Sequence, residues 1–222
     1  AYYPENILNN VEKLNQIGDV KFISDFLSIS NPKIFREKMF EILNKYFDNI
    51  TKTEIANASV KAYIEYERYL QNLRDTAKKY IDNARENNQR IIVLSGRPYH
   101  VDPQINHGID KMIADFGIYV ITEESISHLN KKFPVNVLNQ WTYHSRLYSA
   151  AKICSVSDDM NLVQLVSFGC GLDAVTTDEC REIIESKGKI YTQIKIDEIT
   201  NLGAVKIRIR SLLTALEQKG GR

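Results

Sequence analysis

Hydrophobic positions in residues 1–89 recur at three- and four-residue spacing, which is the period of an α-helix. Asn31 and Pro32 are typical of an N-cap and a first helical position. One face of the helix that follows carries Phe35, Met39, Ile42, Leu43 and Tyr46. Residues 1–89 contain a single glycine and no strand-like run bounded by turn signals, so the pattern predicts a helical region.

The same spacing then continues for about eight turns and predicts one helix roughly 50 Å long. Its tyrosine-rich stripe consists of Ile55, Ala58, Ala62, Tyr66, Tyr69, Leu73, Ala77, Tyr80 and Ala84. Tyr63, Leu70 and Ile81 widen the stripe, so we expect the helix to pack on more than one neighbour. Such a stripe suits a helical core or a brace between domains, and docking of a partner protein is the alternative interpretation.

From residue 90 onward, short apolar runs alternate with helical patterns. Strands are predicted at 90–96, 118–122, 162–169 and 189–197, and helices at 103–117, 143–155, 176–188 and 201–218. Gly117 and Gly188 are placed to end two of these helices. Thr176 and Glu179 have the spacing of a capping box.

Continuous apolar strands that alternate with helices form parallel sheets with right-handed crossovers. We therefore predict an α/β fold: a Rossmann-like four-stranded parallel sheet with flanking helices over residues 90–222. The helical region 1–89, with its one long helix, precedes this sheet as a separate domain.

Composition and charge narrow the function classes. The chain is 43% hydrophobic and 26% charged, with a formal net charge of +1, so no one-signed field is available to hold nucleic acid or an acidic membrane. No apolar run approaches the length that spans a bilayer, and the N-terminus does not resemble a signal peptide. Three well-separated cysteines favour a reducing, cytoplasmic setting. The sequence lacks an initiator Met, and we expect it to be a piece of a longer polypeptide.

Ligands of such sheets lie beyond the carboxyl ends of the strands. Three predicted loops meet at that rim: "SGRPYHVDP" after the first strand, "SFGCGLDAVTTD" after the third and "DEITNLG" after the fourth. The candidate ligand-binding residues of the rim are Ser95, Gly96, Arg97, Tyr99, His100, Asp102, Asn106, His107 and Asn201.

These residue types suit the binding of an anion. Gly96 permits a tight exit from the strand, and Arg97 can pair with a carboxylate or phosphate in a bidentate way. His100 and Asp102 can share a proton or a hydrogen bond. Asn106 and His107 are expected to open the next helix, where free N–H groups favour anions. Alternatively, Asp102 and Asn106 merely cap the turn while His100 packs or faces solvent. The patterns of a dinucleotide fingerprint and of a phosphate-binding P-loop are absent.

Cys170 lies between two glycines, after a predicted strand and before a predicted helix. A helix N-terminus lowers the pKa of a thiol, which suits a nucleophile, a redox thiol or a metal ligand. Cys154 and Cys180 are predicted to be buried apolar side chains. An iron–sulfur cluster typically needs about four thiolates, so Cys170 can supply one ligand only if the others come from outside this chain.

Three motifs together resemble a known family: "GRPYHVDPQINHGI", "SFGCGLDAVTTDE" and "IDEITNLGAVKIRIRSLL". They are similar to the uncharacterised domain of large CoA-substrate-specific enzyme activases, the 2-hydroxyacyl-CoA dehydratase activator-type proteins of anaerobic bacteria. That domain is in turn similar to 2-hydroxyacyl-CoA dehydratase subunits and double-cubane cluster proteins. The resemblance covers about residues 90–216, and the helical half matches only loosely.

The resemblance implies Rossmann-like subdomains around an iron–sulfur cluster, with the family's F-x-C-G cysteine falling on Cys170. An ATP-hydrolysing activase of this kind passes an electron to a dehydratase, so an acyl-CoA dehydratase and the parent protein's ATP-binding activase domains are the implied partners. This chain lacks the upstream cysteines and the glycine-rich phosphate loops of that pattern. We therefore expect no cofactor and no catalysis in the fragment alone.

Three hypotheses follow for the function. The first is a redox-accessory domain in which Cys170 is one cluster ligand of the full-length protein. The second is a non-redox domain that binds an acyl-CoA or another anion through Arg97, His100 and the predicted helix N-termini near Asn106 and Asn201. The third is an interaction scaffold that uses the long helix.

Overall fold

The computed structural model of the protein describes residues 3–10, 22–130, 133–167, 171–196 and 202–218. The chain divides into two compact units, residues 1–69 and residues 70–222, and the division falls inside one long helix. The two units are described separately.

The first unit is helical, as the spacing of its apolar residues predicts. It contains α1 (Tyr3–Asn10), α3 (Pro32–Tyr46) and the first part of α4 (Lys52–Glu86). The Asn31 side chain accepts the N–H groups of Lys33 and Ile34, which confirms the predicted N-cap of α3. Thr51 and Glu54 form a reciprocal capping box at the start of α4, because each side chain accepts the other's backbone N–H.

Helix α4 is 35 residues long, or about 52 Å at 1.5 Å per residue, which confirms the predicted long helix. In the first unit its Tyr63 ring meets Phe35 edge-to-face at 5.9 Å and donates its hydroxyl to the carbonyl of Ile29. In the second unit Ala77, Ile81 and Ala84 of the same helix are buried. The widened stripe thus serves two different neighbours, as expected.

The second unit is built on a four-stranded, all-parallel sheet, which confirms the predicted fold class. The strands are β1 (Ile91–Ser95), β2 (Tyr119–Thr122), β3 (Met160–Val166) and β4 (Thr192–Lys195). Their order in the sheet is β2-β1-β3-β4, so the chain changes direction across the sheet between β1 and β3. In sheets of this kind, the crevice beyond such a switch point is where ligands bind.

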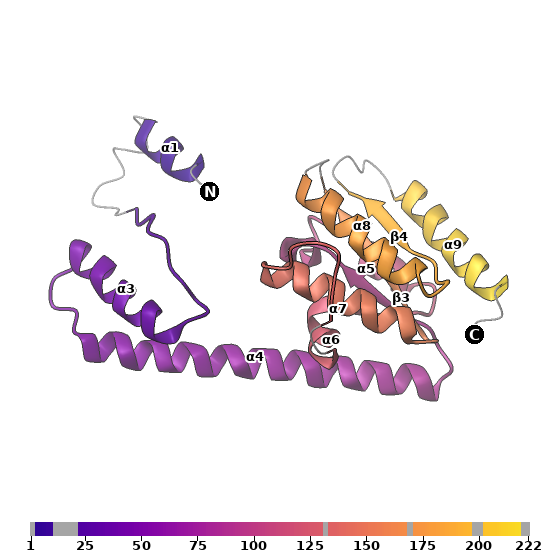
Figure 1. Ribbon diagram of the computed structural model, residues 1–222, viewed down its shortest axis with the longest axis horizontal. Coiled ribbons are helices and arrows are strands. Elements are labelled where there is room, and N and C mark those ends of the chain that lie inside the picture. The colour runs from indigo at the N-terminus through magenta and orange to yellow at the C-terminus, as the bar shows by residue number, and fades with distance from the viewer. Residues whose placement is uncertain (1–2, 11–21, 131–132, 168–170, 197–201, 219–222) are drawn as a thin grey trace. The chain divides into compact units, whose positions relative to one another are not determined.

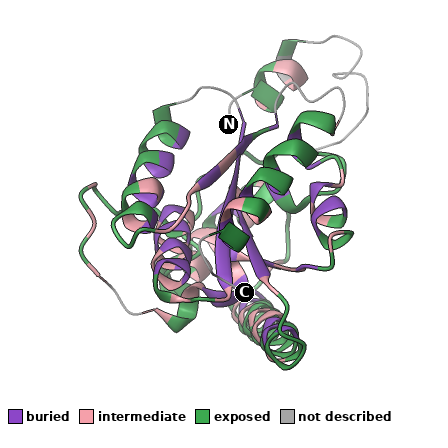
Figure 2. Ribbon diagram, turned by 90° about the vertical axis from the view of Figure 1, so that its right-hand side faces the viewer, coloured by how far each residue is buried: buried purple, intermediate pink, exposed green. Residues whose placement is uncertain are grey.

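Helices cover both faces of this sheet, which explains why β1 and β3 are buried throughout and mostly apolar. Helices α5 (Ile109–Ala114) and α9 (Gly203–Gln218) pack on one face. The end of α4, with α6 (Glu123–Ile126), α7 (Thr142–Val156) and α8 (Gly171–Glu185), packs on the other (Figure 1). Strand residues therefore alternate between two cores, and Figure 2 shows the strands as the most buried part of the unit.

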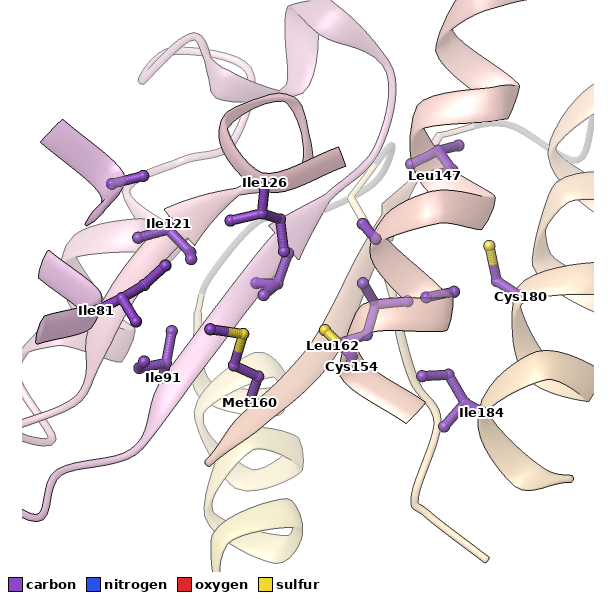
Figure 3. Packing of buried hydrophobic residues seen from close by; sticks show 14 of the residues in the cluster. Ile81, Ile91, Ile121, Ile126, Leu147, Cys154, Met160, Leu162, Cys180 and Ile184 are labelled. Atoms are coloured by element: carbon purple, nitrogen blue, oxygen red, sulfur yellow. The ribbon is translucent and has the colours of Figure 1, made fainter. Parts of the chain in front are cut away.

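Two of the three cysteines lie in the core between the sheet, α7 and α8 (Figure 3). Cys154 and Cys180 have no exposed surface, and burial raises the pKa of both thiols well above the ordinary range. This confirms their prediction as buried apolar side chains. Neither thiol is available as a metal ligand while the core is intact.

Two predicted helix starts are wrong, although both predicted stops are right. Helix α5 begins at Ile109 rather than near residue 103, because His107 and Gly108 have positive φ angles of 55° and 77° that interrupt a helix. Helix α8 begins at Gly171, so Thr176 lies in its interior, where its hydroxyl bonds to helix carbonyls, and forms no capping box with Glu179. The stops after α5 and α8 carry left-handed glycines, Gly117 with φ 75° and Gly188 with φ 69°.

Candidate functional site

The loop that follows β1 folds back over the C-terminal end of that strand. Pro98 opens a 3₁₀ turn, η1 (Pro98–Val101), because its fixed φ suits the first helical position. This turn brings His100 over Gly96, where a Cβ at Gly96 would lie 2.3 Å from His100 Nδ1. Only glycine therefore fits between the strand end and the imidazole, which is 2% exposed.

The hydrogen bonds of His100 define its protonation. Its Nδ1 accepts the backbone N–H of Arg97 at 3.0 Å, so the ring proton is assigned to Nε2. Nε2 then donates to Ser167 Oγ, 3.2 Å away at the end of β3. Burial lowers the pKa of His100 and the nearby Arg97 charge lowers it further, whereas Asp173 raises it. The result is a neutral imidazole whose two hydrogen bonds connect the loop after β1 to the end of β3.

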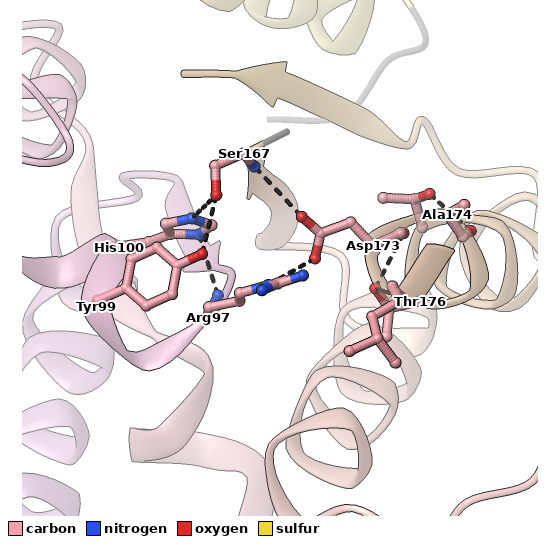
Figure 4. A network of polar contacts seen from close by, with 9 residues as sticks. Arg97, Tyr99, His100, Ser167, Asp173, Ala174 and Thr176 are labelled. Atoms are coloured by element: carbon pink, nitrogen blue, oxygen red, sulfur yellow. Dashed lines mark hydrogen bonds and ion pairs between the residues drawn. The ribbon is translucent and has the colours of Figure 1, made fainter. Parts of the chain in front are cut away.

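An ion pair closes the same junction. Arg97 Nε lies 2.9 Å from Asp173 Oδ1, and Asp173 Oδ2 accepts the N–H of Ser167 at 3.4 Å (Figure 4). Asp173 stands in the first turn of α8, where the helix dipole favours a carboxylate. Tyr99 completes the network, with its hydroxyl 2.9 Å from Ser167 Oγ. Three side chains, those of Tyr99, His100 and Asp173, therefore bond to Ser167. We call Arg97, Tyr99, His100, Ser167 and Asp173 the exit network.

The exit network is better suited to hold backbone segments in place than to activate a nucleophile. In the assigned tautomer His100 Nε2 carries a proton, so it donates to Ser167 and cannot take the serine proton as a general base. The positive charge of Arg97 is already compensated by Asp173. What the network does chemically is to fix the residues on both sides of segment 168–170.

Further titratable side chains lie near the same sheet edge. His144 of α7 is buried, touches the rings of Tyr143 and Trp141 edge-to-face, and has a pKa lowered first by burial and then by the Arg97 charge. Glu123 follows β2 directly, and burial raises its pKa to about 7 although Arg146 lies 3.8 Å away. Sequence reasoning missed both residues, because neither stands in a loop predicted to form the rim.

The structure brings only part of the predicted site together. Gly96, Arg97, Tyr99 and His100 meet at the exit network, and Ser95 is a buried strand end whose hydroxyl lies 3.4 Å from the carbonyl of Val163. Ser167 and Asp173 belong to the network but were not among the predicted residues. Both lie in the quoted stretch "SFGCGLDAVTTD", where a lone serine and a lone aspartate give no periodic signal.

Three predicted residues lie elsewhere. Asp102 is exposed and accepts the N–H of Gln104, so it caps the turn and does not share a hydrogen bond with His100 as one interpretation had it. Asn106 is buried and accepts the N–H of Gly108, while His107 is exposed. Neither opens a helix, because α5 begins only at Ile109 and is six residues long.

The remaining predicted residues, Cys170 and Asn201, lie outside the described residues. Within the described ranges, no group of three or more His, Cys, Asp or Glu side chains is arranged to hold a metal ion. None of the described helices is long and apolar enough to cross a membrane.

The fold and the exit network define an α/β domain whose strand ends are closed by a polar network. The chain belongs to a family described as the CoA enzyme activase uncharacterised domain (DUF2229), whose model matches residues 1–126, more than half of the 222 residues. The match includes the helical region, expected to match only loosely, and the "GRPYH" stretch, and it ends before the other two motifs. Comparisons with curated proteins and with solved structures gave no match.

Proposed function

We propose that this chain is an accessory domain of a CoA-substrate-specific enzyme activase and contributes part of a dehydratase-like iron–sulfur module. Membership of the CoA enzyme activase family supports the activase-like role. The observation that carries the finer proposal is the exit network, because it fixes Ser167 on one side of segment 168–170 and Asp173 on the other. That segment contains Cys170.

The thiols of this chain do not fit a complete cluster. Cys154 and Cys180 are sealed in the core, which leaves Cys170 as the single candidate ligand among the three cysteines. The module therefore needs ligands from outside this chain. The partners that would complete it are the parent protein's ATP-binding activase domains or an acyl-CoA dehydratase.

The test uses the full-length protein, purified without oxygen and analysed for iron and sulfide per folded chain. Cys170→Ser is expected to lower the bound iron by more than about half, because a cluster that loses one of about four thiolates is labile. Cys180→Ala is the matched control, since it removes a thiol that faces the core. Equal iron in Cys170→Ser and wild type would reject the proposed ligand.

An anion site for an acyl-CoA at the same rim has less support. Arg97 is engaged by Asp173, and the pKa of His100 is lowered, so neither presents an uncompensated positive charge. Thermal stabilisation of the protein by an acyl-CoA, lost in Arg97→Lys, would nevertheless favour that site over the cluster. An unchanged melting temperature with acyl-CoA, together with an iron content that depends on Cys170, would favour the cluster.

A further inference from the structure

A groove of about 590 Å³ runs along the free edge of β2. Every residue from Gly117 to Thr122 lines it, so the groove follows the whole strand and the turn before it. Tyr80 of α4 forms one wall, where its ring meets that of Tyr119 edge-to-face at 5.8 Å. Ala114 and its neighbours on α5 form the other wall, on the opposite face of the sheet. No residue of the exit network lines this groove, so it is a separate site.

The floor of the groove is the unpaired edge of a parallel sheet. Tyr119 donates its N–H to the carbonyl of Arg90, which turns Tyr119 and Ile121 toward β1. Because backbone groups alternate along a strand, the N–H and C=O of Val120 point away from β1 and into the groove. Among the described residues, no strand pairs with this edge.

Two side chains add polar groups to the same groove. Asp110 Oδ1 is buried and has no hydrogen-bond partner among the described residues. Asn106 is 1% exposed, and its Oδ1 is used by the N–H of Gly108. The unpaired Asp110 acceptor and the Asn106 amide thus both line the groove beside the open strand.

We propose that this groove binds an extended peptide segment, which adds to β2 as a fifth strand. A peptide chain supplies what the groove lacks: alternating N–H and C=O groups for Val120, and a donor for the Asp110 carboxylate. The four residues of β2 span about 13 Å at 3.3 Å per residue, a short strand that is still within the usual range. A free backbone edge and matching pockets are the two elements of recognition by strand addition.

The two other kinds of occupant fit less well. A small apolar molecule would cover the backbone groups of Val120 without pairing them, and burying unpaired amides is unfavourable. The edge strand of a second folded copy would bring its own flanking helices against the walls formed by Tyr80 and α5.

The probe is a fluorescein-labelled peptide of alternating threonine and valine with one lysine, added to the full 222-residue chain. Its partner probe carries methyl groups on alternate backbone nitrogens, which removes hydrogen-bond donors and keeps every side chain. We expect the first peptide to bind and the methylated peptide to bind about tenfold more weakly or not at all. Amide hydrogen exchange at Val120 should slow on binding, whereas exchange at Tyr119, already bonded to β1, should change little.

Two variants report on the groove without touching the exit network. Val120→Pro removes the outward N–H of an edge position, where proline is tolerated, and is expected to weaken binding about tenfold. Val120→Ile keeps that N–H and should bind as wild type does. Asp110→Asn should weaken binding severalfold, while Asp115→Asn, at the exposed C-cap of the same helix and outside the groove, should not.

Each outcome decides the proposal. Circular dichroism and thermal melting test whether Val120→Pro is folded. The methylated peptide tests the same backbone hydrogen bonds with an unaltered protein. Equal binding of the two peptides would show an apolar cleft rather than strand addition and would overturn the proposal. Failure of the unmethylated peptide to bind at about 1 mM, or unchanged exchange at Val120, would overturn it as well.

Discussion

At the scale of single residues, Gly96 shows how one missing Cβ shapes the candidate site. Replacing it with alanine would put a Cβ 2.3 Å from His100 Nδ1 and 3.0 Å from the carbonyl oxygen of Leu165. The imidazole of His100 must then move, and its hydrogen bonds to Arg97 and Ser167 break. We expect Gly96→Ala to lower the free energy of unfolding by about 1–3 kcal/mol in urea denaturation.

Gly171 provides the matched control for this substitution. It opens α8, and a Cβ there would meet no atom within 4 Å. Gly171→Ala should therefore leave the free energy of unfolding within about 0.5 kcal/mol of wild type. If both substitutions cost the same, the loss at Gly96 does not come from displacing His100.

Glu123 gives a pH dependence with a definite sign. Burial raises its pKa from an ordinary 4.5 to about 7, so between these values the folded state holds a proton that the unfolded state has released. Its contribution to stability is present below pH 4.5 and is lost as the pH rises through about 7. Relative to wild type, Glu123→Gln should therefore gain about 1–3 kcal/mol on going from pH 4 to pH 8.

The measurement is the free energy of unfolding of both proteins across that pH range. Glu124→Gln is the control, because Glu124 also pairs with Arg146 but is more exposed. The buried histidines act in the opposite direction, since the pKa values of His100 and His144 are lowered and their contribution is lost as the pH falls below 6.5. They are present in wild type and variant alike, so the difference isolates Glu123.

The residue scale is also where sequence reasoning reached least far. Arg97 and His100 were identified because they follow a strand predicted by its apolar run. Their partners Ser167 and Asp173 were not, since a partner 67 or 76 residues away in the sequence leaves no local pattern. The predicted pairing of His100 with Asp102 failed because Gly96 and Pro98 turn His100 inward, over the end of β1.

At the scale of elements, Lys189 joins α7 to β3. Its ammonium group donates to the carbonyls of Cys154 and Ser157 at the end of α7, and to Met160 at the start of β3. A cation is favourable at a helix C-terminus, and these three carbonyls have a charged partner in place of water. Burial lowers the pKa of Lys189, so the hydrogen bonds must offset part of its desolvation.

We expect Lys189→Met to lower the free energy of unfolding by about 2–4 kcal/mol. The substitution keeps the apolar part of the side chain but leaves the three carbonyls without a hydrogen-bond donor. Lys187→Met, two residues earlier on exposed surface, is the control and should change it by less than about 0.5 kcal/mol. Urea denaturation of the three proteins measures the difference. A loss at Lys189 no larger than at Lys187 would mean that water replaces the ammonium group without cost.

Element boundaries were predictable where a residue's own chemistry sets them. The N-cap Asn31 and the left-handed Gly117 and Gly188 are local signals, and all three are confirmed. The starts of α5 and α8 were missed because positive φ at His107 and the first turn of α8 depend on packing at the strand exits. The tyrosines of α4 carried a helical period but no sign of which neighbour each would meet.

At the scale of the whole molecule, the alternation of apolar strands and amphipathic helices was sufficient to predict the parallel sheet. It was not sufficient to show what else covers the sheet. Ala77, Ile81 and Ala84, on the last turns of α4, are buried in the same core as β1 and β3. Periodicity alone assigned them to the helical region, since a helix pattern does not state which body it packs on.

Two truncations therefore distinguish the possible domain boundaries. A chain of residues 70–222 keeps the end of α4 against the sheet and should unfold cooperatively, with its core intact. A chain of residues 90–222 removes three buried side chains and exposes the apolar strand face beneath them, a loss of about 3–5 kcal/mol. We expect the shorter chain to melt about 10 °C lower, or to aggregate, because a loss of that size shifts the melting temperature of a domain of this length by roughly 6–20 °C. Equal melting of the two chains would place α4 outside the folding unit of the sheet and the boundary near residue 90.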